Sequence, residues 1–320
     1  MSAAPLHSRT PPPDVFRPRL ALRRRLGAAF AAFCLLLTLG ALGVLFVLLA
    51  QVLLAGWPWV SRKFIANMPS VLTPEQAGMK SAIYGTLWLA VLTGLFSVPV
   101  GLGAAIYLEE YAGRSRLARF IQFNIANLAG VPSIVYGMLG LAVFVRWLRC
   151  DRSVLSGALT MSLLVLPVII IASREALAAV PSSIRQAAFA LGATRWQTVR
   201  HHVLPAALPG MMTGIILALS RGIGETAPLI LIGALSYVPF VPGGPLSDYP
   251  LTSTGLRQWL STALFDQFTV MPIQIYDWVA RPQPEFHHLA AAGIIVLLGV
   301  LLGMNATAVA IRAWQQRRRT

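Results

Sequence analysis

The sequence predicts an all-α, polytopic membrane protein, and two observations lead to this fold class. The first is composition: 56% of the 320 residues are hydrophobic and only 12% are charged, whereas a soluble domain carries about 25% charged residues. The second is distribution, because the apolar residues form blocks long enough for a helix to cross a bilayer core of about 30 Å. We therefore expect about six transmembrane helices. They are predicted at residues 28–55, 83–108, 120–147, 154–172, 206–235 and 289–311.

The two ends of the chain are polar and basic. Residues 1–27 are rich in Pro and Arg and are predicted to form a disordered cytoplasmic head. The block at 28–55 is too long for the apolar region of a cleaved signal peptide, so we expect it to be retained as the first membrane helix. The predicted membrane domain covers residues 28–312, and residues 313–320 are expected to form a basic cytoplasmic tail.

The formal net charge of +15 has two interpretations, a nucleic-acid surface or the excess of Lys and Arg in cytoplasmic loops. We favour the second, because the charges lie between the apolar blocks and at the two ends rather than on one module. No nucleic-acid partner is expected. With both termini in the cytoplasm, the inner segments hold about twice as many basic residues as the outer ones, although the arginines at residues 146–152 argue against this orientation.

The longest cytoplasmic connection, residues 173–205, is predicted to contain two short helices. Ser183 followed by Gln186 fits a capping box, in which each side chain binds the backbone amide of the other residue. Gly192 is the expected end of this first helix, because glycine enters the left-handed conformation without steric cost.

The second short helix is predicted to begin at Thr194, which forms a capping box with Gln197, and to end before Pro205, which lacks the amide needed for continuation. An apolar stripe on the two helices either packs under the bundle as part of a connector or docks in a groove of a partner protein. Both interpretations remain open on these residues alone. The stripe comprises Ala187, Ala188, Leu191, Trp196, Val199 and Val203.

Within the predicted spans, the acid–base pair is Arg221 and Glu225, near the middle of the fifth helix. A lone charge at that depth costs about 2.5–3.5 kcal/mol, so both side chains should face the bundle interior or a wet cavity. One interpretation is an ion pair that fixes helix packing. The other is an anion pathway, in which Arg221 binds phosphate oxygens with its planar fork of donors. In this second case Glu225 orients Arg221 or accepts a hydrogen bond from the proton that phosphate retains near neutral pH. Sulfate has no such proton, so this hypothesis favours phosphate over sulfate.

Small residues recur every four positions along the same helix. Such a pattern allows close helix approach, and we expect it to form a seam with a second subunit rather than a contact within this chain. Gly222 and Gly224 also leave room for an anion near the backbone. The recurring positions are Gly210, Gly214, Ala218 and Gly222.

The chain lacks sequence motifs for ATP hydrolysis and for metal binding. It contains no GxxxxGK[ST] phosphate-binding loop, no HExxH and no CxxC, and its two cysteines, Cys34 and Cys150, suggest neither a disulfide framework nor a metal site. We therefore expect no enzymatic activity, no catalytic residue, no metal and no cofactor bound by this chain.

The connection at residues 173–205 resembles the EAA loop of ABC importer permeases, whose general pattern is EAA-x3-G-x9-I-x-LP. Gln186 and His202 replace the glutamate and the isoleucine of that pattern, while the other positions and the spacing are intact. The resemblance implies that this loop couples the chain to a cytosolic ATPase. The residues carried over are Gln186, Ala187, Ala188, Gly192, Leu204 and Pro205.

Three further strings resemble phosphate-importer permeases: Tyr107–Tyr111, Leu128–Gly137 and Ser220–Pro228. The last string, together with Pro272–Tyr276, is more similar to the PstA-type subunit than to its PstC-type partner. The resemblance covers about residues 30–312 and makes residues 28–312 a transmembrane permease domain. The transport pathway that it implies comprises Arg221, Glu225, Gly222, Gly224 and Thr226.

The same resemblance implies the partners of the chain. They are a second permease subunit of the PstC type, a cytosolic ATPase dimer of the PstB type that uses the ATP, and a periplasmic phosphate-binding protein of the PstS type that docks on the outer loop, about residues 236–288. The expected location is the bacterial inner membrane. The chain would form half of a phosphate pathway that opens alternately to the two sides. The alternatives are a permease for another oxyanion and, less in keeping with the EAA-like loop, a channel or membrane enzyme that works alone.

Overall fold

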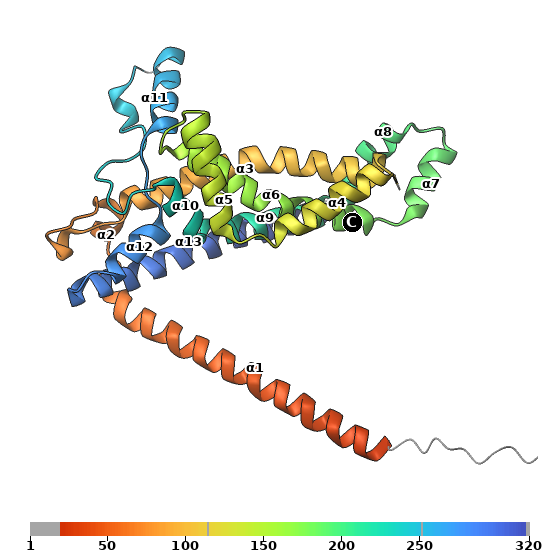
Figure 1. Ribbon diagram of the computed structural model, residues 1–320, viewed down its shortest axis with the longest axis horizontal. Coiled ribbons are helices and arrows are strands. Elements are labelled where there is room, and N and C mark those ends of the chain that lie inside the picture. The colour runs from red at the N-terminus through yellow and green to blue at the C-terminus, as the bar shows by residue number, and fades with distance from the viewer. Residues whose placement is uncertain (1–19, 114, 251, 318–320) are drawn as a thin grey trace, which may run out of the picture. The chain divides into compact units, whose positions relative to one another are not determined.

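The computed structural model describes residues 20–113, 115–250 and 252–317, and the regular elements in these ranges are helices (Figure 1). The chain divides into two compact units, residues 1–51 and 52–320. The helices are α1 (Leu20–Gly56), α2 (Arg62–Ala66), α3 (Lys80–Ile106), α4 (Arg116–Ala129), α5 (Ser133–Gly140), α6 (Val154–Ala178), α7 (Ser182–Ala190), α8 (Arg195–Thr198), α9 (Leu204–Ile223), α10 (Ala227–Ile232), α11 (Ser253–Phe265), α12 (Met271–Val279) and α13 (Pro284–Arg317).

The first unit contains most of α1, whose side chains at residues 23–49 are exposed. This apolar surface is suited to lipid or to another membrane helix. The helix begins at Leu20, so the predicted boundary of the disordered head at residue 27 is wrong. Residues 20–27 consist mostly of Leu, Ala and Arg, which are strong helix formers and extend the membrane helix toward the N-terminus. Residues 1–19 of the predicted head lie outside the described residues.

The second unit is built around α3, α6 and α9. Helices α3 and α6 run parallel: Ser162 donates a hydrogen bond to the carbonyl of Thr93 at 3.3 Å, and about two turns further along both helices Gly101 lies against Ile169. Helix α9 packs against another part of α6, where Val165 and Ala218 share a buried cluster.

The small-residue pattern of α9 faces α6 of the same chain, so the prediction of a seam with a second subunit is wrong. A Cβ atom added to Gly210 would lie 3.0 Å from the Cβ of Ala176, and one added to Gly222 would lie 2.9 Å from Val165. Gly214 is similarly close to Ala172. Small residues permit close approach to any neighbouring helix, and the pattern itself does not specify which helix that is.

The predicted span at residues 120–147 is not one kinked helix. It is divided into α4 and α5, which meet at an angle of 103°. Gly130 ends α4, and Pro132 is the N-cap of α5. Proline removes an amide donor and forces the preceding residue out of the helical region, so two helices meet here at a sharp turn.

Helices α4 and α5 together make one crossing of the bundle. The last turn of α6 lies beside the segment that follows α3, because Arg174 forms a salt bridge with Glu109 at 3.3 Å. Since α3 and α6 are parallel and end on the same side, the chain between them must return to the other side. Five long apolar helices and this bent pair therefore account for six spans among the described residues.

Two further boundaries differ from the prediction. The predicted span at residues 206–235 ends at Ile223 and is followed by the separate short helix α10, with Pro228 in its first turn. At the C-terminus α13 continues to Arg317, so residues 313–317 of the predicted tail are helical, and residues 318–320 lie outside the described residues.

The end of the bundle opposite the Arg174–Glu109 bridge is closed by α2, α11, α12 and the start of α13 (Figure 1). Trp278 of α12 and Phe286 of α13 are buried together with Met79, which precedes α3. The loop that carries α11 and α12 is thus anchored to the bundle by its own apolar core.

Candidate functional site

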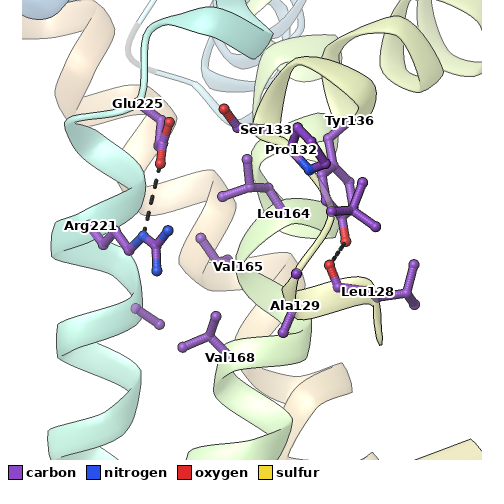
Figure 2. A pocket seen from close by; sticks show the side chains of 13 residues that line it. Leu128, Ala129, Pro132, Ser133, Tyr136, Leu164, Val165, Val168, Arg221 and Glu225 are labelled. Atoms are coloured by element: carbon purple, nitrogen blue, oxygen red, sulfur yellow. Dashed lines mark hydrogen bonds and ion pairs between the residues drawn. The ribbon is translucent and has the colours of Figure 1, made fainter. Parts of the chain in front are cut away.

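A pocket of about 210 Å³ lies between the turn that joins α4 to α5, the middle of α6 and the end of α9 (Figure 2). Its apolar floor comes from α6, and Arg221 and Glu225 form its charged wall. The lining residues are Leu128, Ala129, Gly130, Val131, Pro132, Ser133, Tyr136, Leu164, Val165, Val168, Ala218, Arg221 and Glu225.

Arg221 and Glu225 form a loose ion pair one turn apart, as their spacing predicts. The Nε atom of Arg221 lies 3.9 Å from Oε1 of Glu225, too long for a hydrogen bond. The Arg221 side chain is 72% exposed within this chain, and that of Glu225 is 25% exposed. Most of the donor capacity of the guanidinium therefore remains available to a ligand or to a neighbouring subunit.

The opposite wall of the pocket is the turn between α4 and α5. The last carbonyls of α4 are already used: Leu128 accepts hydrogen bonds from the hydroxyl of Tyr136 at 2.8 Å and from the amide of Val131 at 3.1 Å. At the start of α5, the amide of Val135 donates to the carbonyl of the N-cap Pro132 at 3.0 Å, whereas the first two amides of a helix have no acceptor within it. With its π-helical extension α5 continues to Trp147, and the N-terminus of a helix carries a partial positive charge. The Arg221 guanidinium and the start of α5 therefore favour an anion, whereas the Glu225 carboxylate opposes one.

The other predicted pathway residues are near this pocket but do not line it. Gly222 is buried against Val165 on the side of α9 that faces α6. Gly224 is exposed and forms the C-cap of α9, and Thr226 is the N-cap of α10, where its carbonyl accepts hydrogen bonds from Leu229 and Ile230. The structure thus brings together Arg221 and Glu225, while Gly222 packs within α9 and Gly224 and Thr226 flank Glu225 at the break between α9 and α10.

Ser133 and Tyr136 line the pocket, and the sequence-based list of pathway residues omits them. Figure 2 shows them on the wall opposite Arg221. The available signal was Gly130 and Pro132 within an apolar block, because a helix broken inside the membrane exposes backbone groups where a ligand can bind.

The connection between α6 and α9 has the two predicted short helices, α7 and α8. Gly192 follows α7 with φ +82°, the left-handed conformation predicted for this position. The capping box at Thr194 is confirmed, since its amide donates to Gln197 at 2.8 Å and its hydroxyl accepts from the amide of Gln197 at 3.3 Å. The capping box predicted at Ser183 is wrong: the helix begins one residue earlier, and its N-cap is Pro181.

Pro205 does not end the helix, which corrects the sequence-based prediction. Helix α8 continues through a π-helical segment, Val199–Val203, directly into α9, where Leu204 and Pro205 are in the first turn. The wider hydrogen-bond spacing of a π-helix accommodates a residue that lacks an amide. The loop is therefore mechanically continuous with α9.

The apolar stripe of this loop divides into a buried part and an exposed part. Ala188, Val199 and Val203 are buried, whereas Leu191 is 90% exposed and Trp196 is 55% exposed. Gln186 and Ala187 are exposed on α7. The buried part serves as a connector, and the exposed apolar tip is available to a partner.

Among the described residues, no group of three or more His, Cys, Asp or Glu side chains is arranged to hold a metal ion.

Comparison with known proteins identifies the family. Residues 97–319 match the family described as binding-protein-dependent transport system inner membrane component. The chain is 34% identical over 313 residues to phosphate transport system permease protein PstA 1 of Mycobacterium tuberculosis (strain CDC 1551 / Oshkosh), covering 96% of this chain and 95% of the relative. It is 31% identical over 231 residues to PstA of Haemophilus influenzae (strain ATCC 51907 / DSM 11121 / KW20 / Rd), covering 72% and 74% of the two chains.

Solved structures agree on the fold. A bacterial alginate ABC transporter in complex with its alginate-bound periplasmic protein matches with a TM-score of 0.59 at 18% identity, covering 91% of this chain and 96% of the other. The MetNI methionine ABC transporter in an inward-facing conformation matches with a TM-score of 0.55 at 18% identity, covering 73% and 94%. The chain therefore belongs to the binding-protein-dependent transport system inner membrane components, as a multi-pass permease subunit of an ABC importer.

Proposed function

We propose that this chain is the PstA-type permease subunit of an importer of inorganic phosphate, and that the pocket between α4, α5, α6 and α9 is its half of the translocation pathway. The observation that carries the proposal is the meeting of the Arg221 guanidinium and the N-terminus of α5 across one pocket (Figure 2). The names of the relatives, which are phosphate transport permeases, favour the same substrate.

The chemistry of the two walls suits a tetrahedral oxyanion. A guanidinium binds two oxygens of one phosphate with parallel hydrogen bonds, and the amides of a helix N-terminus bind others. The apolar floor from Leu164, Val165 and Val168 strengthens these interactions by excluding water. Glu225 repels the anion, and we assign it two roles: it orients Arg221, and it accepts a hydrogen bond from the O–H group that phosphate carries near neutral pH.

The pocket is open on the side of Arg221, and this supports a pathway shared with a second permease subunit of the PstC type. An arginine side chain that is 72% exposed near the middle of a membrane bundle would face lipid at a high cost. A second subunit, or the water-filled pathway between two subunits, removes that cost.

The connection between α6 and α9 is proposed as the coupling loop. The exposed apolar tip of Leu191 and Trp196 fits helix-in-groove docking on a cytosolic ATPase dimer of the PstB type, which hydrolyses the ATP. This assignment places the loop and both termini in the cytoplasm. The opposite end, with α11 and α12, then faces a periplasmic binding protein of the PstS type.

The test is ATP-dependent uptake of labelled phosphate in cells that lack their own phosphate permease and express this chain with its partner subunits. Arg221→Gln should lower uptake by about 10- to 100-fold, the equivalent of one charge-assisted hydrogen bond of roughly 1.5–3 kcal/mol. Arg116→Gln is the matched control, because Arg116 is an exposed arginine at the start of α4 and does not line the pocket.

Phosphate uptake that is not inhibited by excess sulfate, and that Arg221→Gln lowers by about 10- to 100-fold while the ATPase still co-purifies, supports both the substrate and the pathway. An assembled complex that takes up no phosphate removes phosphate as the cargo. In that case uptake of labelled sulfate by the same complex would identify a permease for another oxyanion.

A further inference from the structure

We propose that Glu110 and Arg185 are positioning residues that fasten the coupling helix α7 to the inner end of α3, so that a displacement of α7 moves α3 directly. The proposal rests on the coupling role proposed above for the loop between α6 and α9. It assigns a transmission role to an ion pair that lies outside the pocket.

The guanidinium of Arg185 is held from several directions. Its Nη2 atom donates to Oε1 of Glu110 at 2.6 Å, and its Nε atom lies 3.2 and 3.3 Å from the two oxygens of the same carboxylate. It also donates to two backbone carbonyls, from Nη1 to Val180 at 2.8 Å and from Nη2 to Leu177 at 3.0 Å. The side chains of Arg185 and Glu110 are only 20% and 10% exposed.

These bonds join α7 and the turn before it to a segment about 75 residues earlier in the sequence. Arg185 belongs to α7, the carbonyl of Leu177 belongs to the last turn of α6, that of Val180 to the short connection between α6 and α7, and Glu110 lies in the π-helical segment Tyr107–Tyr111 that continues α3. A cation at the C-terminus of α6 also interacts favourably with its dipole. The planar fork is needed for this arrangement, because an ammonium group does not span a carboxylate and two carbonyls at fixed angles.

The neighbouring pair, Glu109 and Arg174, makes a weaker link between the same two ends. It has one hydrogen bond, at 3.3 Å, and the buried Nε atom of Arg174 has no partner in the part of the chain described. Because α3 is also packed along α6, where Gly101 meets Ile169, the two pairs make α3, the end of α6 and α7 one mechanical unit. The Glu110–Arg185 pair is the member of this unit that includes the coupling helix.

The Glu110–Arg185 pair provides a second connection through which a displacement of α7 is transmitted to the membrane helices. Through the chain itself, α7 is connected to α6 and, by way of α8, to α9, which carries Arg221. The Glu110–Arg185 pair adds α3, which is joined to these helices only through side chains at this end. Without the pair, ATP hydrolysis should continue, but fewer ions should be transported for each ATP that is hydrolysed.

The first experiment measures phosphate uptake and ATP hydrolysis by the complete complex in the same proteoliposomes. Glu110→Ala should lower the number of phosphate ions imported per ATP by about fivefold or more, equivalent to the loss of roughly 1 kcal/mol of coupling, with ATPase retention and hydrolysis rate nearly unchanged. Glu110→Gln, which keeps an acceptor oxygen, should fall between Glu110→Ala and wild type. Glu175→Ala is the matched control, because Glu175 is an exposed acid on the last turns of α6, and it should leave the ratio unchanged.

The second experiment does not depend on the cargo. Gly103→Cys, in a chain in which Cys34 and Cys150 are replaced by Ser, gives a labelling site on α3 where an added Cβ has no neighbour within 4 Å. A fluorophore there should change its emission between the nucleotide-free and the vanadate-trapped complex. Glu110→Ala should abolish this change and Glu175→Ala should retain it.

An emission change that survives Glu110→Ala overturns the proposal, and so does loss of the bound ATPase from the Glu110→Ala complex, which would make the pair part of the docking surface. If the complex imports no phosphate but the emission change depends on Glu110, the proposed substrate is wrong and the positioning role stands.

Discussion

Two arginine–glutamate pairs of this permease differ in almost every respect, although each combines the same side chains. Arg185 and Glu110 are mostly buried and lie 2.6 Å apart, and the guanidinium makes further bonds to two carbonyls. Arg221 and Glu225 lie 3.9 Å apart, and Arg221 is 72% exposed within the chain. The first arginine has little donor capacity left for a ligand, whereas the second has most of it. An arginine whose hydrogen-bond donors are already used within the chain is suited to a positioning role, whereas one with free donors is suited to bind a ligand. Its presence in or near the membrane does not distinguish the two roles.

The largest expected difference between the two pairs is in stability. Arg185→Ala should destabilise the chain by about 2–4 kcal/mol, because it leaves the Glu110 carboxylate and two helix-end carbonyls without their partner. Arg221→Ala should change stability by less than about 1 kcal/mol, as expected for an exposed pair. Thermal unfolding of the detergent-solubilised complex, followed by the loss of its size-exclusion peak, measures the difference. If Arg185→Ala and Arg221→Ala shift the midpoint of thermal unfolding by the same amount, the two pairs do not differ in their contribution to stability.

The next effect concerns geometry at the open pair. Arg221→Lys keeps the charge but loses the bidentate fork, so the KM for phosphate should rise about tenfold, equivalent to roughly 1.4 kcal/mol, with an unchanged amount of assembled complex. Initial rates of labelled phosphate uptake over a range of concentrations give the KM. A KM equal to that of wild type would mean that the Arg221 fork does not bind the anion.

A smaller effect is expected at Glu225. Glu225→Gln removes the carboxylate proposed to accept a hydrogen bond from phosphate, and a hydrogen bond to a charged group is worth about 1.5–3 kcal/mol. The preference for phosphate over sulfate should therefore fall by at least about tenfold, because sulfate has no O–H group and loses no such bond. Competition of labelled phosphate uptake by unlabelled sulfate measures it. If wild type and Glu225→Gln show the same preference, Glu225 only orients Arg221.

The smallest effect is expected on the wall formed by α5. Ser133→Ala removes a hydroxyl group from the pocket lining near the N-terminus of α5 and should raise the KM about two- to fivefold, equivalent to roughly 0.5–1 kcal/mol. Ser261→Ala on α11, which lies outside the pocket, is the control. If Ser133→Ala leaves the KM unchanged, only the backbone amides of this wall contribute to binding of the anion.

Much of the fold and part of the candidate site could be predicted from the sequence. The composition and the length of the apolar blocks predict the membrane class and six spans, because both depend only on transfer of side chains into lipid. The caps at Gly192 and Thr194 were predictable because they depend on a few adjacent residues. The i,i+4 spacing likewise predicts that Arg221 and Glu225 share one face of a helix.

Only the tertiary structure decided which segments meet. The apolar block at residues 120–147 predicts one span, but not the 103° turn that divides it and brings the start of α5 and Arg221 to the same pocket. It shows a small-residue pattern on α9, but not that α6 is the neighbour. It gives no sign that Glu110 binds Arg185, 75 residues away. The physical reason is that hydrophobicity, capping and helical spacing act locally along the chain, whereas pockets and ion pairs between helices depend on how complete helices pack.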